Sequence, residues 1–213
     1  GIPLKEKNRF RTLSDLTKEE KAKIFSQLTI LLTTKISETD ISQLIGCVYT
    51  LLKEDKGTPL RDGREFASLL NACDKMGKIG VAVSLCLGSR GEILSDAQTI
   101  LNEYRKTIGK SMDLLYSTPK NIQELDAIYA VNGRDILSEK MVSPIASILS
   151  NSSGLNPDKP IILFSDTDDG RLKVSARTNQ IMVDRGINLN VIMQTVAKEF
   201  DGKGGGHNIA AGA

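Results

Sequence analysis

The spacing of apolar residues changes near Pro119, and this change constrains the fold more than any other feature of the chain. Before it, segments such as "REFASLLNACDKM" repeat apolar residues every three or four positions, which is typical of amphipathic helices. After it come the short runs "LDAIYAV", "PIILF" and "LKVSA", which are typical of strands. We therefore predict an α/β fold, with a mainly helical segment over residues 1–118 and a small α/β domain with a mixed sheet over residues 119–213.

Capping signals place the ends of several predicted elements. Thr17 and Glu20 form a capping box, and Ser95 begins a second Ser-x-x-Gln pattern. Pro144 is expected near the start of one helix, and Gly202 just past the end of another. Helices are expected at 17–32, 39–52, 61–76, 95–115, 142–154 and 188–200, with an apolar segment at 81–88. The turn-rich "SDTDDGR" is expected to join two strands, and "NIAAGA" to begin another.

Composition excludes several classes of protein. The 213 residues carry a net charge of +2, so an anion site must come from a local arrangement and not from an overall basic field. No apolar run approaches the roughly 20 residues that cross a bilayer, so no membrane association is expected. Cys47, Cys73 and Cys86 lie far apart in apolar helical contexts, which argues against a disulfide framework and a zinc site. We expect reduced core cysteines in a cytoplasmic protein. Because the chain starts without a methionine and stops among alanines, we also expect a part of a longer protein.

The strand "LKVSAR" carries a polar face. Side chains alternate along a strand, so Lys173, Ser175 and Arg177 would lie together on the face opposite the apolar residues. Two cations beside a hydroxyl would suit a phosphate group, since Arg offers a planar fork of donors. A solvent-facing strand of an antiparallel pair gives the same pattern, so both interpretations stay open.

The segment "GKGGGHNIAAGA" places Gly204, Gly205 and Gly206 directly before His207, the one histidine of the chain. Glycines let backbone amides approach an anion closely, and an imidazole can donate a hydrogen bond to a phosphate oxygen. The alternative is a flexible or helix-ending loop with an incidental histidine. The pattern is neither a Walker loop nor a dinucleotide fingerprint, since neither the Gly-Lys-Ser/Thr sequence nor a preceding strand is present.

A polar stripe lies on the predicted helix at 61–76. Arg64, Ser68, Asn71 and Lys75 are spaced by four, three and four residues and therefore share a face. This face could contact a nucleic-acid backbone, or it could simply be solvated.

Together these stretches resemble one family. "KVSAR" followed farther along by "GGGHNIAAGA" is similar to the carboxy-terminal half of the DHH phosphoesterases, and within them most similar to the archaeal RecJ-like single-strand exonucleases. "RDGREFASLLNACDKMGKIGVAVSLCLG" and the opening "GIPL" with "RTLSDLTKEEK" resemble the same family, so the resemblance covers essentially the whole chain. It implies that residues 119–213 form the DHH-associated domain, which closes over a separate metal-bearing DHH domain and grips nucleic-acid phosphates.

The resemblance also implies roles for individual residues. The expected substrate contacts are Arg177, Gly204, Gly205, Gly206 and His207, with Ser175 and Asn208 as further candidates and with Arg64, Asn71 and Lys75 near the substrate path. No catalytic residue is assigned in this chain, although His207 is a candidate. No metal ligand is expected in it, because the family's Asp and His ligands for manganese (or magnesium) lie in the amino-terminal DHH domain.

The implied parent is a nuclease of DNA repair and replication that hydrolyses single-stranded DNA or RNA, expected to act from the 5′ end. Its partners would be the nucleic acid and the DHH domain. One departure is that Asp74 and Lys75 stand where the family has Gly and Arg, which adds a negative charge and loses a guanidinium. The alternative function is therefore a non-catalytic replication scaffold of the same fold that binds the GINS complex, although the intact "SAR" and "GGGH" elements disfavour it.

Overall fold

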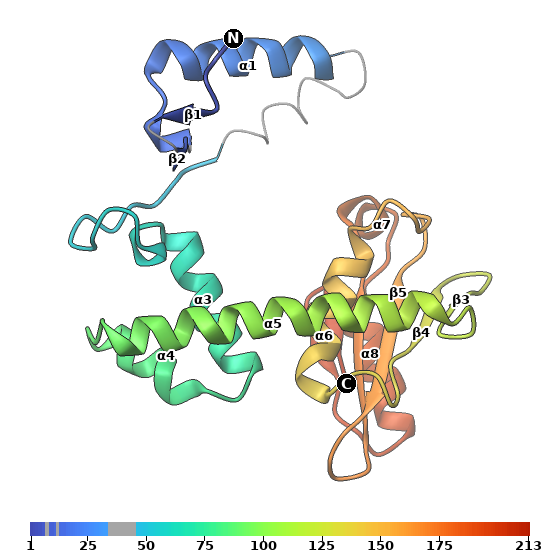
Figure 1. Cartoon of the computed structure of the whole chain (residues 1–213). Coiled ribbons are helices and arrows are strands. Elements are labelled where there is room, and N and C mark those ends of the chain that lie inside the picture. Colours follow the sequence, from blue (N-terminus) through green and yellow to red (C-terminus); the bar gives the residue numbers. More distant parts are fainter. Residues whose placement is uncertain (7–8, 12, 34–45) are drawn as a thin grey trace. The chain divides into compact units, whose positions relative to one another are not determined.

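The computed structural model describes residues 1–6, 9–11, 13–33 and 46–213, and these form two compact units (Figure 1). The first unit is Gly1–Arg64 and the second is Glu65–Ala213, so the division falls inside helix α3 (Gly63–Lys75). The predicted change from helices to strands near residue 118 lies within the second unit.

The first unit contains the predicted helix with its capping box. Helix α1 (Lys18–Leu32) begins after Thr17, whose Oγ1 accepts from the Glu20 N–H at 3.2 Å, while the Thr17 N–H donates to Glu20 Oε2 at 2.9 Å. Both terminal nitrogens of Arg11 bind the Glu20 carboxylate, at 2.9 and 2.6 Å. The other elements of this unit are β1 (Lys5–Glu6), β2 (Arg9–Phe10) and the 3-10 turns η1 (Leu13–Asp15) and η2 (Pro59–Arg61).

The helix predicted at 39–52 is wrong where the structure describes it. Positions 39–45 lie outside the described residues, and positions 46–52 form no helix. Thr50 forms an isolated antiparallel bridge with Asp62, and the Gly63 N–H donates to the Tyr49 carbonyl at 2.8 Å. The "VYT" run favours extended backbone because β-branched and aromatic side chains lose rotamer freedom in a helix.

Two helices of the second unit begin earlier than the capping signals predict. Helix α5 begins at Glu92 after Gly91, so Ser95 lies in its first turn and is not its cap. Helix α6 begins at Glu139 after Ser138, so Pro144 lies inside it rather than near its start. Buried apolar side chains on both sides of the proline offset the hydrogen bond that its ring removes. The helices after α3 are α4 (Ile79–Cys86), α5 (Glu92–Ser117), α6 (Glu139–Ser150), α7 (Gln180–Asp184) and α8 (Leu189–Glu199).

A mixed six-stranded sheet follows these helices in the order β3-β4-β5-β6-β8-β7, which confirms the predicted α/β class with a mixed sheet. Strands β4 and β5 are parallel and are joined through α6, and the other neighbouring pairs are antiparallel. The "SDTDDGR" segment forms the β5–β6 turn as predicted. The strands are β3 (Ile122–Glu124), β4 (Tyr129–Asn132), β5 (Ile161–Asp166), β6 (Leu172–Arg177), β7 (Gly205–Gly206) and β8 (Ala210–Gly212).

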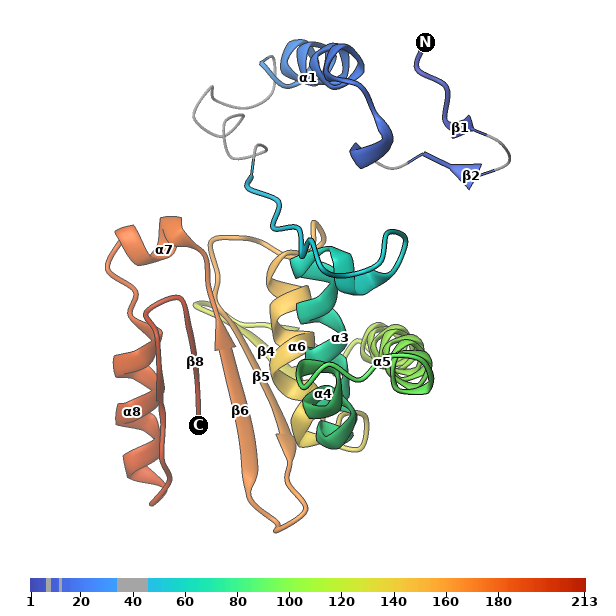
Figure 2. The ribbon, with the colours of Figure 1, turned by 90° about the vertical axis from the view of Figure 1, so that its left-hand side faces the viewer.

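Helices cover both faces of this sheet, as Figure 2 shows with α6 on one side and α8 on the other. The larger core lies between β4, β5 and the helices α3, α5 and α6, where Val131, Ile145 and Leu163 are fully buried. The smaller core lies between α8 and the strands β6 and β8. It consists of Ala176, Leu189, Met193 and Ala211. Strand β6 is therefore covered on both faces, and not on one face only as its alternating sequence predicted.

The cysteines divide between core and surface. Cys73 is buried in α3, and burial raises the pKa of its thiol, whereas Cys47 and Cys86 are exposed. The prediction that all three are core residues is therefore wrong for two of them. Within the described ranges, no helix is long and apolar enough to span a membrane.

Candidate anion-binding site

Arg177, the last residue of β6, is fixed by four hydrogen bonds. Its Nε donates to Ser147 Oγ at 2.9 Å and its Nη2 donates to Ser143 Oγ at 2.5 Å, both on α6. Its Nη1 donates to the Ala176 carbonyl at 2.8 Å and to the Ala211 carbonyl at 3.4 Å. A guanidinium has five N–H groups, so these four bonds leave one N–H, on Nη2, for a ligand.

The charge of Arg177 is partly buried and has no counter-charge in the described part of the chain. Its side chain is of intermediate exposure, and burial lowers the pKa of the guanidinium from its ordinary value. It stays cationic, because an arginine pKa lies far above neutrality. All four acceptors around it are neutral oxygens. A desolvated cation surrounded by neutral acceptors favours an anion at its open side.

The glycine segment folds into the hairpin of β7 and β8 rather than into a flexible loop. Gly204 packs so closely on α8 that a Cβ there would lie 2.1 Å from the Met193 carbonyl oxygen. Gly206 has a φ of +147°, and a Cβ there would lie 2.6 Å from the Ala210 carbonyl oxygen. At Gly205 a Cβ would meet its nearest atom, Asn190 Oδ1, at an ordinary 3.7 Å. The fold itself thus requires two of the three glycines, and Gly205 alone is free of a steric requirement.

The tip of this hairpin lies at the same end of the sheet as Arg177. Arg177 is opposite Ala210 in the register of β6 and β8, and the Thr178 N–H donates to the Ile209 carbonyl at 3.0 Å. From the other side, the Leu189 N–H at the start of α8 donates to the Asn208 carbonyl at 3.0 Å. The side chains of His207 and Asn208 are exposed at this tip. The structure therefore places Arg177, His207 and Asn208 at the same end of the sheet.

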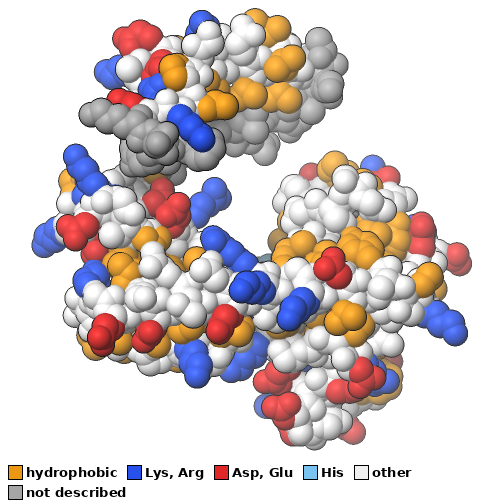
Figure 3. All heavy atoms as spheres, viewed as in Figure 1, with side chains coloured by type: hydrophobic (Ala, Val, Ile, Leu, Met, Phe, Trp, Pro, Cys, Tyr) orange, Lys and Arg blue, Asp and Glu red, His pale blue; other side chains and the backbone are white. Residues whose placement is uncertain are grey.

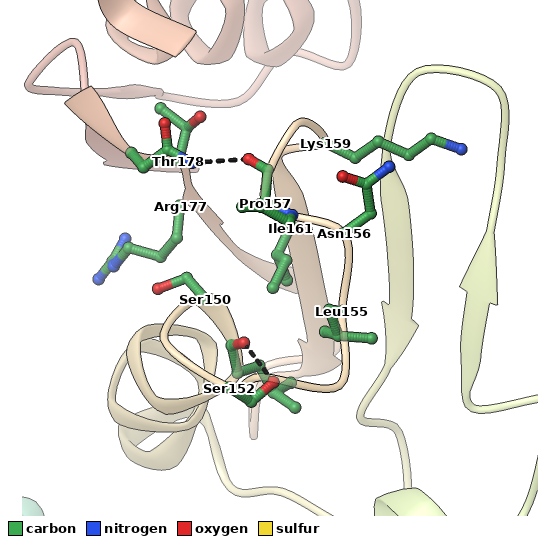
Figure 4. Close-up of a pocket in the computed structure, with 11 residues that line it drawn as sticks. Ser150, Ser152, Leu155, Asn156, Pro157, Lys159, Ile161, Arg177 and Thr178 are labelled. Atoms are coloured by element: carbon green, nitrogen blue, oxygen red, sulfur yellow. Dashed lines mark hydrogen bonds between the residues drawn. The ribbon is translucent and has the colours of Figure 1, made fainter. Parts of the chain in front are cut away.

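A small polar cavity of about 30 Å³ lies beside Arg177 (Figure 4). Arg177 and Thr178 line one side of it, and Leu155 and Asn156 lie across from them. The Thr178 Oγ1 is buried there without a hydrogen-bond partner. This volume suits one water molecule and is too small for a larger anion.

Ser175 does not lie on an open face, which corrects the predicted phosphate cradle. It is only 3% exposed, because α6 packs over that face of β6. Lys173 is exposed, but it lies at the other end of β6 from Arg177, opposite Ser165 in the register with β5. On the same face, β8 places only Ala210 and Gly212 beside Arg177 and Ser175, whereas β5 on the other side places Ile161 and Leu163 there.

The candidates Arg64, Asn71 and Lys75 belong to helix α3 and not to the strands that carry Arg177 and the glycine hairpin. Arg64 and Asn71 are exposed, and Arg64 belongs to the first unit. Lys75 Nζ binds Asp74 Oδ2 at 2.9 Å, and this hydrogen bond lowers the pKa of the Asp74 carboxyl. The substituted pair therefore neutralises itself, so Asp74 does not present an isolated negative charge.

Sequence reasoning missed Ser143 and Ser147, which hold the Arg177 guanidinium. A signal was present, because "EKMVSPIASILS" is an apolar helix interrupted by serines four residues apart on one face. The pairing of that face with β6 depends on the crossover from β4 through α6 to β5, which no local pattern shows. Among the described residues, no three His, Cys, Asp or Glu side chains gather to hold a metal ion.

The sequence matches the DHHA1 domain family over residues 126–213. An uncharacterized protein of Methanocaldococcus jannaschii is 36% identical over 154 residues, which are 72% of this chain and 32% of that protein. The chain thus spans about a third of the length of this curated relative.

Two solved structures are similar to parts of the chain. RecJ in complex with Mn²⁺ from Thermus thermophilus is 20% identical with a TM-score of 0.47, over 70% of this chain and 20% of that one. The C-Ala domain of alanyl-tRNA synthetase from Aquifex aeolicus is 15% identical with a TM-score of 0.34, over 43% of this chain and 78% of that one. The range matched by the domain family contains α6, α8, the strands from β4 to β8 and the whole Arg177 site. Residues 126–213 are therefore identified as a DHHA1 domain.

Proposed function

We propose that this chain binds the phosphates of single-stranded nucleic acid at the end of the sheet formed by Arg177 and the glycine hairpin. The observation that carries the proposal is the partly buried guanidinium of Arg177, which has only neutral acceptors among the described residues and one N–H directed to none of them. The remaining N–H can donate one charge-assisted hydrogen bond to a phosphate oxygen, and the positive charge of the guanidinium attracts the phosphate.

The surface around Arg177 supports a chain ligand better than a small enclosed one. The neighbouring residues Ala210 and Gly212 carry at most a methyl group, and His207 stands exposed at the hairpin tip. The adjacent cavity of about 30 Å³ is too small for a nucleotide. One fixed cation, set beside small residues and a cavity too small for a nucleotide, suits a backbone phosphate of a longer strand.

For the parent protein we propose a metal-dependent exonuclease that hydrolyses single-stranded DNA or RNA from the 5′ end. The proposal rests on the resemblance to RecJ-like enzymes and on the DHHA1 match. The described residues do not fit a two-metal centre, since no three of their His, Cys, Asp or Glu side chains gather. Metal chemistry in the parent would therefore need ligands from the two thirds of such a protein that this chain does not span. The role of this chain would be to hold the phosphates, and His207 is a candidate donor there. The Asp74–Lys75 pair gives no specific support to a scaffold that binds the GINS complex.

A second cationic surface offers an internal comparison. Helix α5 exposes Arg105, Lys106 and Lys110 between acidic side chains, and Figure 3 shows blue and red side chains together along it. Mixed charges on an exposed helix are typical of a solvated face. These side chains carry no fixed hydrogen-bond geometry like that of Arg177, so we expect no specific phosphate binding on α5.

The test is a titration of the chain with a short fluorescein-labelled oligothymidylate, followed by anisotropy at several salt concentrations. We expect weak binding whose logarithm falls with the logarithm of salt concentration, with a slope of about −0.7 for each phosphate contacted. An unlabelled duplex should compete less well than an unlabelled single strand. Affinity that does not change with salt, or preference for the duplex, would contradict the proposal.

A further inference from the structure

Ser143 and Ser147 contact the same guanidinium, but their hydroxyl hydrogens differ in what they bind. Ser147 Oγ accepts from Arg177 Nε and donates its own hydrogen to the Ser143 carbonyl at 3.1 Å. Ser143 Oγ accepts from Arg177 Nη2 at 2.5 Å, and its own hydrogen is directed to no acceptor among the described residues. A hydroxyl always carries one donor hydrogen, so Ser143 keeps a donor for a ligand.

The free donor of Ser143 lies beside the free donor of Arg177. The unused N–H of the guanidinium is on Nη2, the nitrogen that also binds Ser143 Oγ. Accepting a hydrogen bond from a cation polarises the hydroxyl and makes it a stronger donor. Two adjacent donors, one of them charged, can bind two oxygens of the same phosphate.

We propose that Ser143 is a second phosphate-binding residue, and that Ser147 is a positioning residue that holds the Arg177 guanidinium in the orientation this requires. The inference rests on the proposed function, because it assigns partners to the same phosphate. It adds a neutral donor from α6, an element that neither the strand motif nor the glycine motif contains. Helix α6 would therefore contribute a residue to the phosphate site in addition to packing on the sheet.

The test compares four alanine variants and two threonine variants by oligothymidylate titration at several salt concentrations. Ser143→Ala should weaken binding about tenfold, which is typical for loss of one hydrogen bond to a charged group. The salt slope should not change, since serine is neutral and neutralises no phosphate. Arg177→Ala should weaken binding and also reduce the slope by about 0.7.

Ser147→Ala and Ser150→Ala complete the set. Ser147→Ala should weaken binding by about threefold, because it removes one of four bonds that fix the guanidinium, and Ser147→Thr should restore the affinity since it keeps the hydroxyl. Ser150 is the control on the same helix: it lines the cavity beside Arg177, but its hydroxyl donates to the Ser147 carbonyl at 3.0 Å and not to the guanidinium site. Ser150→Ala should bind like the unchanged chain.

The outcomes separate this inference from the proposed function. If Arg177→Ala weakens binding and Ser143→Ala does not, the role of Ser143 is wrong while the phosphate site stands. If neither variant changes binding, the proposed function itself fails. Thermal melts of each variant identify losses of binding affinity that are caused by unfolding. If the affinity loss of Ser143→Ala is accompanied by a matching fall in melting temperature, or if its salt slope changes, the direct contact between Ser143 and phosphate is wrong. Ser143→Thr, which keeps the hydroxyl, should retain the binding that Ser143→Ala loses.

Discussion

Replacing Arg177 with alanine is expected to weaken binding of single-stranded oligonucleotides by about ten- to a hundredfold, which is the amount that a hydrogen-bonded charged contact contributes. Arg177→Lys should recover the salt slope but only part of the affinity, because an ammonium keeps the charge and loses the fork that binds Ser143 and Ser147 together. Anisotropy titrations of both variants over a range of salt measure the two effects separately.

Lys173 provides the matched control for this experiment. It lies on the same strand and is cationic and exposed, but it is opposite Ser165 at the far end of the sheet. Lys173→Ala should therefore leave affinity nearly unchanged. Arg177→Ala removes four hydrogen bonds, which destabilises the fold, but it also removes the cost of desolvating a charge. Because these two effects oppose each other, the melting temperature should stay close to that of the unchanged chain. Equal losses for Lys173→Ala and Arg177→Ala would indicate a general charge effect and contradict a specific site.

Replacing Gly204 with alanine is expected to reduce the free energy of unfolding by about 3 kcal/mol or more, because overpacking at backbone distance forces the main chain to move. The added methyl group would lie 2.1 Å from the Met193 carbonyl oxygen and 3.0 Å from the Ala197 Cβ. For a domain of this size, such a loss lowers the melting temperature by about 6–12 °C. Thermal and urea unfolding followed by circular dichroism measure it.

Gly205→Ala is the control for the glycine series. Its nearest neighbours are side-chain atoms of Asn190 and Gln194, at 3.7 and 3.9 Å. We expect its unfolding free energy to change by no more than about 0.5 kcal/mol. A melting temperature for Gly204→Ala equal to that of Gly205→Ala would mean that α8 does not pack on the hairpin as described.

The sequence correctly predicted those helices and strands whose formation depends on residues close together in the chain. The capping box at Thr17, the helix at 61–76 and the strands "PIILF" and "LKVSA" follow from hydrogen bonds and periodicities within a few residues. The start of α5 was misplaced because Gly91 begins that helix without a side-chain cap, so Ser95 gave the stronger sequence signal. The short α7 has no apolar periodicity long enough to recognise.

The candidate site was only partly predictable, for a physical reason. The alternation of "LKVSAR" correctly separates Ala176 from Ser175 and Arg177, but it cannot tell that α6 buries Ser175 while leaving Arg177 an open side. Likewise, three consecutive glycines indicate that the backbone approaches another group closely, but they do not show whether that group is a ligand or another part of the protein. In this fold Gly204 approaches α8 and Gly206 permits a positive φ, so the glycine pattern has a structural cause that is independent of any ligand.

The most direct test of the phosphate site is a ¹H–¹⁵N NMR titration of the chain with a short unlabelled oligothymidylate. We expect the Arg177 Nε–H and the backbone amides of Gly205, His207 and Asn208 to shift together and to saturate with one affinity. Resonances of α5, including Arg105 and Lys110, should stay in place. Shifts that occur on α5 while Arg177 and the hairpin remain unchanged would show that the phosphate does not bind at Arg177.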